Sequence, residues 1–150
     1  MGRIQFNTDT GETGEVLHRF DDHRAQVAGV GFSPDGKYLS SCGSDNRVLT
    51  YNLSDLKKPP IDLKRVSAAN EMRYLDSGLC AVSTYGGGLE LCQPARARSR
   101  MRFSGHQLLP PVDGQPARKP MIRALSASPD GKHLVSTDNN GWVYVWPLDQ

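Results

Sequence analysis

The stretch that decides the fold is residues 22–52, DHRAQVAGVGFSPDGKYLSSCGSDNRVLTYN. Two tight-turn signals divide it: SPDG at residues 33–36, where Pro presets φ and Gly permits a positive φ, and GSDN at residues 43–46. The runs between these turns are rich in β-branched and aromatic side chains, which favour strands. The stretch therefore predicts three antiparallel strands, the first with an apolar side of Val27, Val30 and Phe32, the others over residues 37–42 and 47–52.

Four side chains in this stretch resemble the buried hydrogen-bond network of the WD-repeat β-propeller family. In that family a His ahead of the first strand, a Ser or Thr in the second, an Asp in the next turn and a Trp in the third strand bond to one another. The matching residues here are His23, Ser41, Asp45 and Tyr51. Because buried polar groups must be paired, such a network fixes strand register. The resemblance implies an all-β fold of four-stranded antiparallel blades.

The rest of the chain reads as copies of this unit. Residues 4–7 and 15–20 resemble the third and fourth strands of a half-blade over residues 1–21, with Phe6 in the Trp position. The first full blade is predicted over residues 22–66. Its fourth strand, residues 61–66, follows a loop ended by two prolines, which cannot join a central ladder.

The next copy, residues 67–104, is degenerate. Strands are predicted over residues 69–74, 79–84, 89–92 and 99–103. The family's polar network is missing, because glycines occupy residues 86–88 where the Asp would sit, Cys92 replaces the Trp, and no His precedes the first strand. Since its register would then rest on packing alone, this blade is expected to be the loosest.

The last copy, residues 105–150, stops at its third strand. It opens on Gly105-His106, continues after an insertion at residues 107–119, and repeats SPDG at residues 128–131. Strands are predicted through Ile122, Leu125 and Ala127 and over residues 133–137 and 142–146. The network positions hold His106, Ser136, Asn140 and Trp146. Asn in place of Asp keeps an acceptor but loses the charge, so a weaker network is expected.

The spacing of the turn glycines supports this division. Gly36 and Gly78 are 42 residues apart, within the roughly 40–45 residues of a WD-type blade, and the 53 residues from Gly78 to Gly131 exceed it by about the insertion. Thirteen strands are too few for a closed propeller, which typically has four to eight four-stranded blades. An incomplete propeller is therefore expected, which leaves three possibilities: a piece of a longer propeller, two copies closing a ring by exchanging residues 15–20, or an open monomer.

Composition and the N-terminal sequence indicate in which cellular compartment the protein is expected. Hydrophobic residues make up 37% of the chain, with fifteen Gly and ten Pro, and no apolar run approaches membrane-spanning length. The sequence MGRIQFNTDT at the N-terminus has no apolar signal-peptide core. A cytoplasmic or nuclear protein without a membrane partner is expected. Cys42, Cys80 and Cys92 lack a CxxC spacing and fall in predicted strands, which indicates buried free thiols.

No catalytic or metal-binding pattern stands out. The four histidines, His18, His23, His106 and His133, show no ligand spacing such as HExxH. The glycines at residues 86–88 follow a strand but precede no helix pattern, so a phosphate loop is not indicated. We therefore expect no enzyme activity, no metal and no cofactor.

Basic residues gather between Pro94 and Arg123, where seven cations face one Asp and give +6, so the remainder of the chain carries −4. Alternation with uncharged residues predicts one cationic face on an outermost strand, formed by Arg96, Arg98, Arg100 and Arg102. This face either blunts an edge strand against unwanted pairing or binds an acidic protein segment, a phosphorylated peptide or RNA. Nucleic acid is disfavoured because no aromatic interleaves the arginines.

The favoured function is a non-enzymatic scaffold for protein partners, with the anion binder as the alternative. By resemblance, partners dock on the face where the loops between fourth and first strands emerge, or in the central channel. Weak contact candidates near that face are Arg24, Ser44 and Asn139. The anion-binding alternative would use Arg118 and Lys119, at the end of the insertion, together with the arginines of residues 96–102. Fold alone does not fix a function, so partner identity stays open.

Overall fold

The computed structural model describes residues 16–65, 67–106 and 119–148, and in these ranges the chain is built from strands. Their only helical element is a three-residue 3-10 turn, and no helix there is long and apolar enough to cross a membrane. The elements in order are β1 (Val27–Phe32), β2 (Tyr38–Gly43), β3 (Arg47–Asn52), β4 (Ile61–Lys64), β5 (Ala69–Tyr74), β6 (Cys80–Thr84), β7 (Gly88–Gln93), η1 (Pro94–Arg96), β8 (Arg98–Ser104), β9 (Ile122–Ala127), β10 (His133–Asp138) and β11 (Val143–Pro147).

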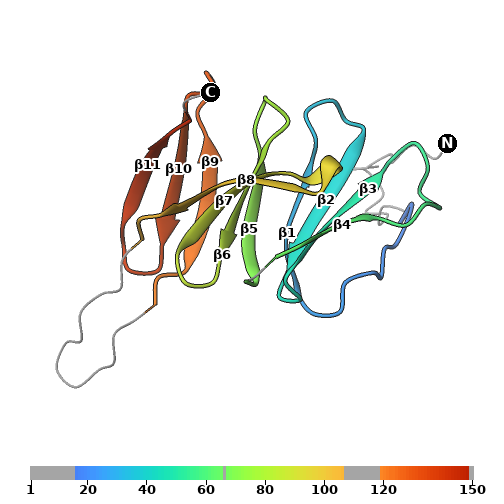
Figure 1. Cartoon of the computed structure of the whole chain (residues 1–150), viewed down its shortest axis with the longest axis horizontal. Coiled ribbons are helices and arrows are strands. Elements are labelled where there is room, and N and C mark those ends of the chain that lie inside the picture. Colours follow the sequence, from blue (N-terminus) through green and yellow to red (C-terminus); the bar gives the residue numbers. More distant parts are fainter. Residues whose placement is uncertain (1–15, 66, 107–118, 149–150) are drawn as a thin grey trace, which may run out of the picture.

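These strands form three antiparallel sheets that stand side by side along the long axis (Figure 1). We call them the first blade (β1–β4), the middle blade (β5–β8) and the last blade (β9–β11). Each sheet follows chain order, so every strand pairs with its sequence neighbour. The predicted strands of these three blades are confirmed, with ends that shift by at most two residues. Gly36 and Gly131 close the two SPDG turns at φ 67° and 69°, values that favour glycine.

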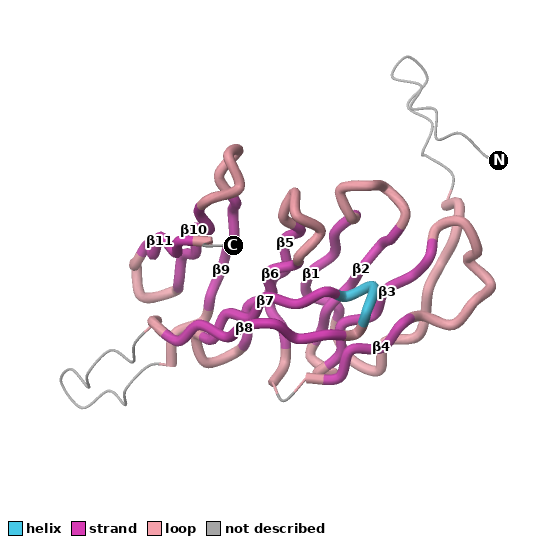
Figure 2. Tube along the Cα trace, turned by 45° about the horizontal axis from the view of Figure 1, so that its top comes forward, coloured by secondary structure: helices cyan, strands magenta, loops and turns pink. Residues whose placement is uncertain are grey.

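Two hydrophobic cores join the blades. One lies between the first and middle blades and includes Cys42, Val48, Met72 and Val82. The other lies between the middle and last blades and includes Leu89, Leu91, Ile122, Leu125 and Leu134. The first strands of the three blades also meet, β1 against β5 and β5 against β9 (Figure 2). The middle blade is thus packed on both faces.

The face that β1 turns inward is made of glycine. A Cβ added at Gly29 would lie 2.9 Å from Cys42 Sγ and from the Met72 amide nitrogen, so the close approach requires glycine. Val27, Val30 and Phe32 are 48%, 62% and 64% exposed. The prediction that they form the apolar side of the strand stands, but this side faces away from the middle blade rather than into it.

The predicted half-blade is not seen as a strand in the described residues. Residues 4–7, with Phe6, lie outside them, as does Glu15, and residues 16–20 run as irregular chain with Val16 79% exposed. The predicted strand over residues 15–20 is wrong for residues 16–20, because an extended segment needs a paired neighbour and these residues have none among those described. Phe20 instead packs against Tyr51, with ring centroids 3.9 Å apart and ring planes tilted by 31°.

All three cysteines are free and buried. Cys92 Sγ donates a 3.5 Å hydrogen bond to the Cys80 carbonyl oxygen. Burial raises the pKa of the Cys42 thiol to about 12 and raises that of Cys80 well above its usual value. Because the thiolate is the reactive form, these groups act as small core side chains.

Candidate functional site

The first blade carries a satisfied polar network at the end where β2 turns into β3. His23 Nδ1 lies 2.9 Å from Asp45 Oδ2, and His23 Nε2 lies 2.8 Å from Ser41 Oγ. Tyr51, in the family's Trp position, lies beside Ser41 and Asp22, and burial followed by the Asp22 carboxylate raises its pKa to about 12. Both ring nitrogens of His23 therefore have partners.

Asp45 ties this network to the chain that enters the blade. Its Oδ2 also accepts a 3.0 Å hydrogen bond from the Arg24 amide. Burial alone would raise the pKa of Asp45, but the hydrogen bonds from the Arg24 amide and from His23 outweigh it and hold the pKa below its usual value. The carboxylate is thus the charged anchor of the network.

The last blade holds a longer chain of donors. Trp146 Nε1 donates to Ser136 Oγ at 2.7 Å, and Ser136 Oγ lies 2.7 Å from His106 Nε2. Because indole nitrogen can only donate, the Ser136 hydroxyl proton is available to His106, whose Nδ1 proton then points to Asp138 Oδ2 at 2.8 Å. The chain of bonds runs from Trp146 to Asp138, through side chains placed by β10 and β11 and by His106, which lies two residues after the end of β8.

The acceptor in this blade is Asp138, so the prediction of Asn140 is wrong. The carboxylate follows the network serine by four residues in the first blade but by only two here, because the turn after β10 is built differently. Asp138 Oδ1 accepts from the amides of Asn140 and Trp142 and so closes that turn itself. Asn140 Nδ2 is buried without a partner among the described residues.

The acceptor of the last blade is therefore a charged carboxylate, whereas the sequence prediction had placed the uncharged Asn140 there. Burial would raise its pKa, but hydrogen bonds from His106, and then from the Trp142 and Asn140 amides, lower the pKa below its usual value. In the first blade Asp45 also bonds the amide of the chain that enters the blade, and here Asn139 makes that bond. Its Oδ1 accepts a 2.8 Å hydrogen bond from the Met121 amide. The weaker network expected from an Asn acceptor is not what forms.

The middle blade has a polar centre of another kind than the family's network, and the sequence did not predict it. Arg65 Nη2 donates to Glu90 Oε2 at 2.8 Å, and Ser99 Oγ donates to the other carboxylate oxygen. The side chains of Arg65 and Glu90 are only 2% and 6% exposed. Sequence reasoning missed this ion pair because it looked for a histidine by type.

The position of Arg65 relative to the first strand of its blade is the signal that would have identified this ion pair. Arg65 lies four residues ahead of Ala69, the first residue of β5, as His23 lies four residues ahead of Val27, the first residue of β1. Arg65 thus occupies the histidine position of the middle blade. Its partner Glu90 comes from the third strand rather than from the turn, where the glycines at residues 86–88 offer no side-chain acceptor.

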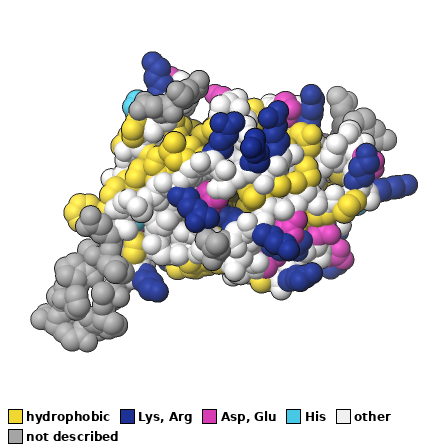
Figure 3. Space-filling model, in the orientation of Figure 1, with side chains coloured by type: hydrophobic (Ala, Val, Ile, Leu, Met, Phe, Trp, Pro, Cys, Tyr) yellow, Lys and Arg dark blue, Asp and Glu magenta, His cyan; other side chains and the backbone are white. Residues whose placement is uncertain are grey.

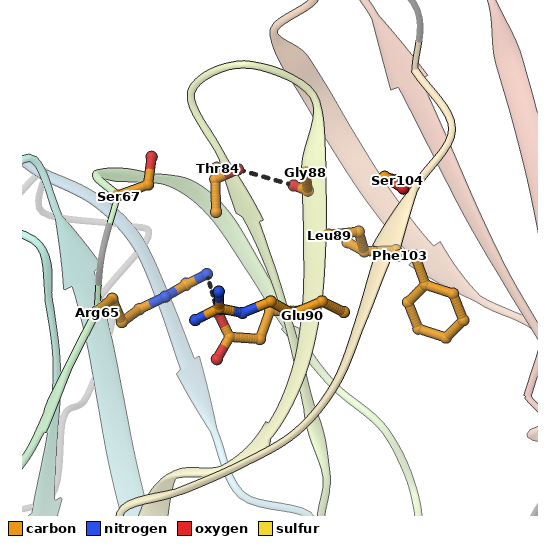
Figure 4. Close-up of a pocket in the computed structure, with 9 residues that line it drawn as sticks. Arg65, Ser67, Thr84, Gly88, Leu89, Glu90, Phe103 and Ser104 are labelled. Atoms are coloured by element: carbon orange, nitrogen blue, oxygen red, sulfur yellow. Dashed lines mark hydrogen bonds and ion pairs between the residues drawn. The ribbon is translucent and has the colours of Figure 1, made fainter.

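A cavity of about 230 Å³ opens beside this ion pair. Figure 4 shows Arg65 reaching toward Glu90, with Thr84 and Gly88 nearby, while the Leu89 and Phe103 side chains point away from the ion pair. Arg102 also lines the cavity, and its Nε lies 3.7 Å from Glu90 Oε2. The remaining lining residues are Ser67 and Ser104.

The predicted arginine face is divided by a β-bulge. Ser99 pairs with Cys92 and Met101 with Leu91, so Arg100 is an extra residue in β8. An inserted residue reverses the alternation beyond it, which puts Arg98, opposite Gln93, and Arg102, opposite Glu90, on opposite faces of the sheet.

Arg96 departs further from the prediction, since it ends η1, a turn that packs on the first blade. Figure 3 shows the Lys and Arg side chains of this side of the molecule in separate groups, with uncharged surface between them. The four arginines predicted to share one face therefore do not form a single stripe.

The other candidate contact residues lie near the turns that carry the networks. Arg24 and Asn139 are exposed, and Ser44 is half-buried with its amide bonded to the Gln26 carbonyl. Lys119 is exposed, whereas Arg118 and the rest of the insertion at residues 107–118 lie outside the described residues. Within the described ranges no group of three or more His, Cys, Asp or Glu side chains is placed to hold a metal ion.

Comparison with known proteins agrees with this architecture. The model of the WD domain, G-beta repeat family (WD40) matches residues 14–52 and 99–147. Protein LST8 homolog from Drosophila melanogaster is 22% identical over 148 residues, which are 95% of this chain and 42% of that protein. The chain thus spans less than half the length of this relative. Because the matched segments make up more than half of its residues, the chain belongs to the WD domain, G-beta repeat (WD40) family.

Proposed function

We propose that this chain is a non-enzymatic protein-interaction scaffold that works as part of a larger propeller or assembly in the cytoplasm or nucleus. Membership of the WD40 family and similarity to Protein LST8 homolog support an interaction role. The observation that carries the proposal is that the stack of blades exposes an apolar sheet face at each end.

The two end faces are built alike. At one end β1 presents Val30 and Phe32, which are 62% and 64% exposed, and at the other β11 presents Val143 and Val145, 65% and 61% exposed. Figure 3 shows hydrophobic surface at the end of the molecule where the last blade lies. Contiguous apolar surface of this kind marks interaction sites in folded proteins.

Further blades are the natural cover for these faces, because the inner faces of the same sheets already pack against a blade. Three described sheets are fewer than a closed propeller needs. The cover would be additional blades of a longer chain or a second copy of this one. The match covers only 42% of the length of Protein LST8 homolog, which supports the first of these two possibilities.

Sedimentation velocity of the chain tests the proposal. We expect self-association, as a discrete dimer if a second copy closes the stack and as polydisperse aggregates if further blades are needed. Charged pairs on the end faces, Val30→Lys with Phe32→Lys or Val143→Lys with Val145→Lys, should reduce this association. Met101→Lys is the matched control, because Met101 is 50% exposed but lies on β8, away from both ends.

A dilute, monodisperse monomer that unfolds cooperatively and binds no hydrophobic dye would contradict the assembly. The interaction role has its own test, which uses a photo-crosslinking residue at Phe32 or Val145. It should capture protein in cell extract far more efficiently than the same residue at Met101. Equal labelling from all three positions would argue against the end faces as interaction surfaces.

A further inference from the structure

The ion pair of the middle blade leaves hydrogen-bond donors unused. Arg65 Nε and Nη1 are buried and have no partner among the described residues, although Nη2 bonds to Glu90. The histidines in the same position of the other two blades have partners at both ring nitrogens. Buried N–H groups of a charged side chain are costly to leave unpaired, so a missing acceptor is indicated.

The cavity next to Arg65 has room for that acceptor. Its volume of about 230 Å³ is below that of a typical pocket for a drug-sized ligand but suits a side chain or a chain end. Thr84, Gly88 and Ser104 line it beside the two arginines, whereas the Leu89 and Phe103 side chains turn to the other face of the sheet, toward the last blade (Figure 4). The site therefore favours a small polar group.

The charges around the cavity indicate which chemical group would bind there. Arg65 and Arg102 bring two positive charges to the cavity and Glu90 brings one negative charge, which leaves one positive charge in excess. A single negative charge balances this excess, whereas a phosphate dianion would meet stronger repulsion from Glu90. Two neighbouring N–H groups of a guanidinium match the two oxygens of a carboxylate.

We infer that this cavity is a binding site for a carboxylate of a protein partner, either an Asp or Glu side chain or a C-terminal carboxylate. The carboxylate accepts hydrogen bonds from Arg65 and is approached by Arg102. The inference rests on the proposed scaffold function for its partner, but the site itself can be tested with peptides alone.

The test measures fluorescence anisotropy of labelled peptides mixed with the full chain. One pair is Ala-Leu-Glu-Leu-Ala and Ala-Leu-Gln-Leu-Ala, both amidated, which isolates a side-chain carboxylate. A second pair is Ala-Leu-Leu with a free or an amidated C-terminus, which isolates the terminal carboxylate. Binding of either acidic peptide without its neutral match supports the site and identifies the source of the carboxylate. No binding, or equal binding of acid and neutral peptides, would mean that the cavity holds water only and would overturn the inference.

Two variants and a control locate the binding. Arg65→Lys keeps the charge but removes the unpaired donors, so the acidic peptide should bind tenfold or more weakly. Arg102→Gln changes an exposed side chain that does not threaten folding and should weaken binding about threefold. Arg98→Gln, on the same strand but the other face, should leave affinity unchanged. An equal loss in Arg98→Gln, or displacement of the peptide by inorganic phosphate more readily than by acetate, would overturn the inference.

The outcome separates this site from the scaffold proposal. If acidic peptides fail to bind while the end faces still self-associate and crosslink, the carboxylate site is wrong and the proposed function stands. If the end faces neither associate nor crosslink while the peptides bind through Arg65, the carboxylate site stands and the assembly proposal is wrong.

Discussion

The middle and last blades differ in two properties, the completeness of the polar network and the burial of the strands, and each blade has the advantage in one of them. The last blade lies in a segment matched by the family model and has a fully bonded chain from Trp146 to Asp138, yet every second residue of β11 is exposed. The middle blade has an incompletely paired Arg65 and its strands β5–β7 lie outside the matched segments, yet four of the five residues of β6 are buried. Good agreement with the motif and close packing fall on different blades.

Magnitudes decide which blade should be the more stable. A net hydrogen bond contributes about 1 kcal/mol, whereas burial of one large aliphatic side chain contributes about 1.5–3 kcal/mol. The middle blade buries side chains such as Val82 toward the first blade and Leu89 and Leu91 toward the last. The last blade buries one face only in the part of the chain that the structure describes. Packing should therefore outweigh the better polar network.

The largest effect is expected from removing one partner of the buried ion pair. Arg65→Ala leaves Glu90 charged and buried, which should lower the free energy of unfolding by about 3–5 kcal/mol. Urea denaturation measures this. The double variant Arg65→Met with Glu90→Leu replaces both charges by apolar groups and should lose far less. Equal losses in the single and double variants would contradict the view that the cost comes from an unpaired charge.

A smaller effect distinguishes the two acceptor candidates of the last blade. Asp138→Ala removes the acceptor of His106 and of two turn amides, so the free energy of unfolding should fall by about 2–3 kcal/mol. Asn140→Ala removes a side chain whose amide nitrogen has no partner among the described residues and should change stability by about 0.5 kcal/mol or less. If thermal unfolding ranks these variants the other way, Asn140 is the network residue after all.

The smallest effect is a change of stability with pH. The folded-state pKa values of Asp45 and Asp138 lie below the ordinary 3.8, so the unfolded chain binds more protons than the folded chain in that window. Their contribution is present above pH 3.8 and is lost as pH falls through the lowered values. Acid titration of Asp45→Asn or Asp138→Asn should therefore show a shallower loss than the unmodified chain.

Asp35 is the comparison for this titration. Its pKa is also lowered, first by the Ser33 hydroxyl, but its carboxylate lies on the surface, where solvent screens the interaction. Asp35→Asn should therefore change the acid limb less than either network variant. A steeper acid limb after Asp138→Asn would mean that the carboxylate is not stabilised in the folded state.

Local patterns predicted the strands well and the details of the site less well. The SPDG turns and alternating side chains were enough to place β1 to β11, because turn chemistry and strand propensity act within a few residues. Arg65 was missed because its partner Glu90 is 25 residues away and of a different type from the family's residues. The acceptor Asp138 was missed because the spacing from serine to carboxylate depends on the turn.

One further error and one expectation that packing argues against have geometric origins. The arginine face failed because a single extra residue, Arg100, reverses side-chain alternation, and a bulge leaves no signal in an alternating sequence. The expectation that the middle blade is the loosest stays a prediction, and it did not take into account that this blade has a neighbour on both sides. That arrangement depends on the order of blades in space rather than on the residues of any one of them.

Native-state hydrogen exchange of β6 and β10 tests the central claim, that packing on both faces outweighs a complete polar network. Both are central strands of their sheets, so their backbone ladders are matched. We expect the amides of Cys80–Thr84 to exchange at least about tenfold more slowly than those of His133–Asp138, because local opening of the middle blade must expose two cores. Faster exchange in β6 than in β10 would contradict the claim and restore the view that the polar network decides which blade is the more stable.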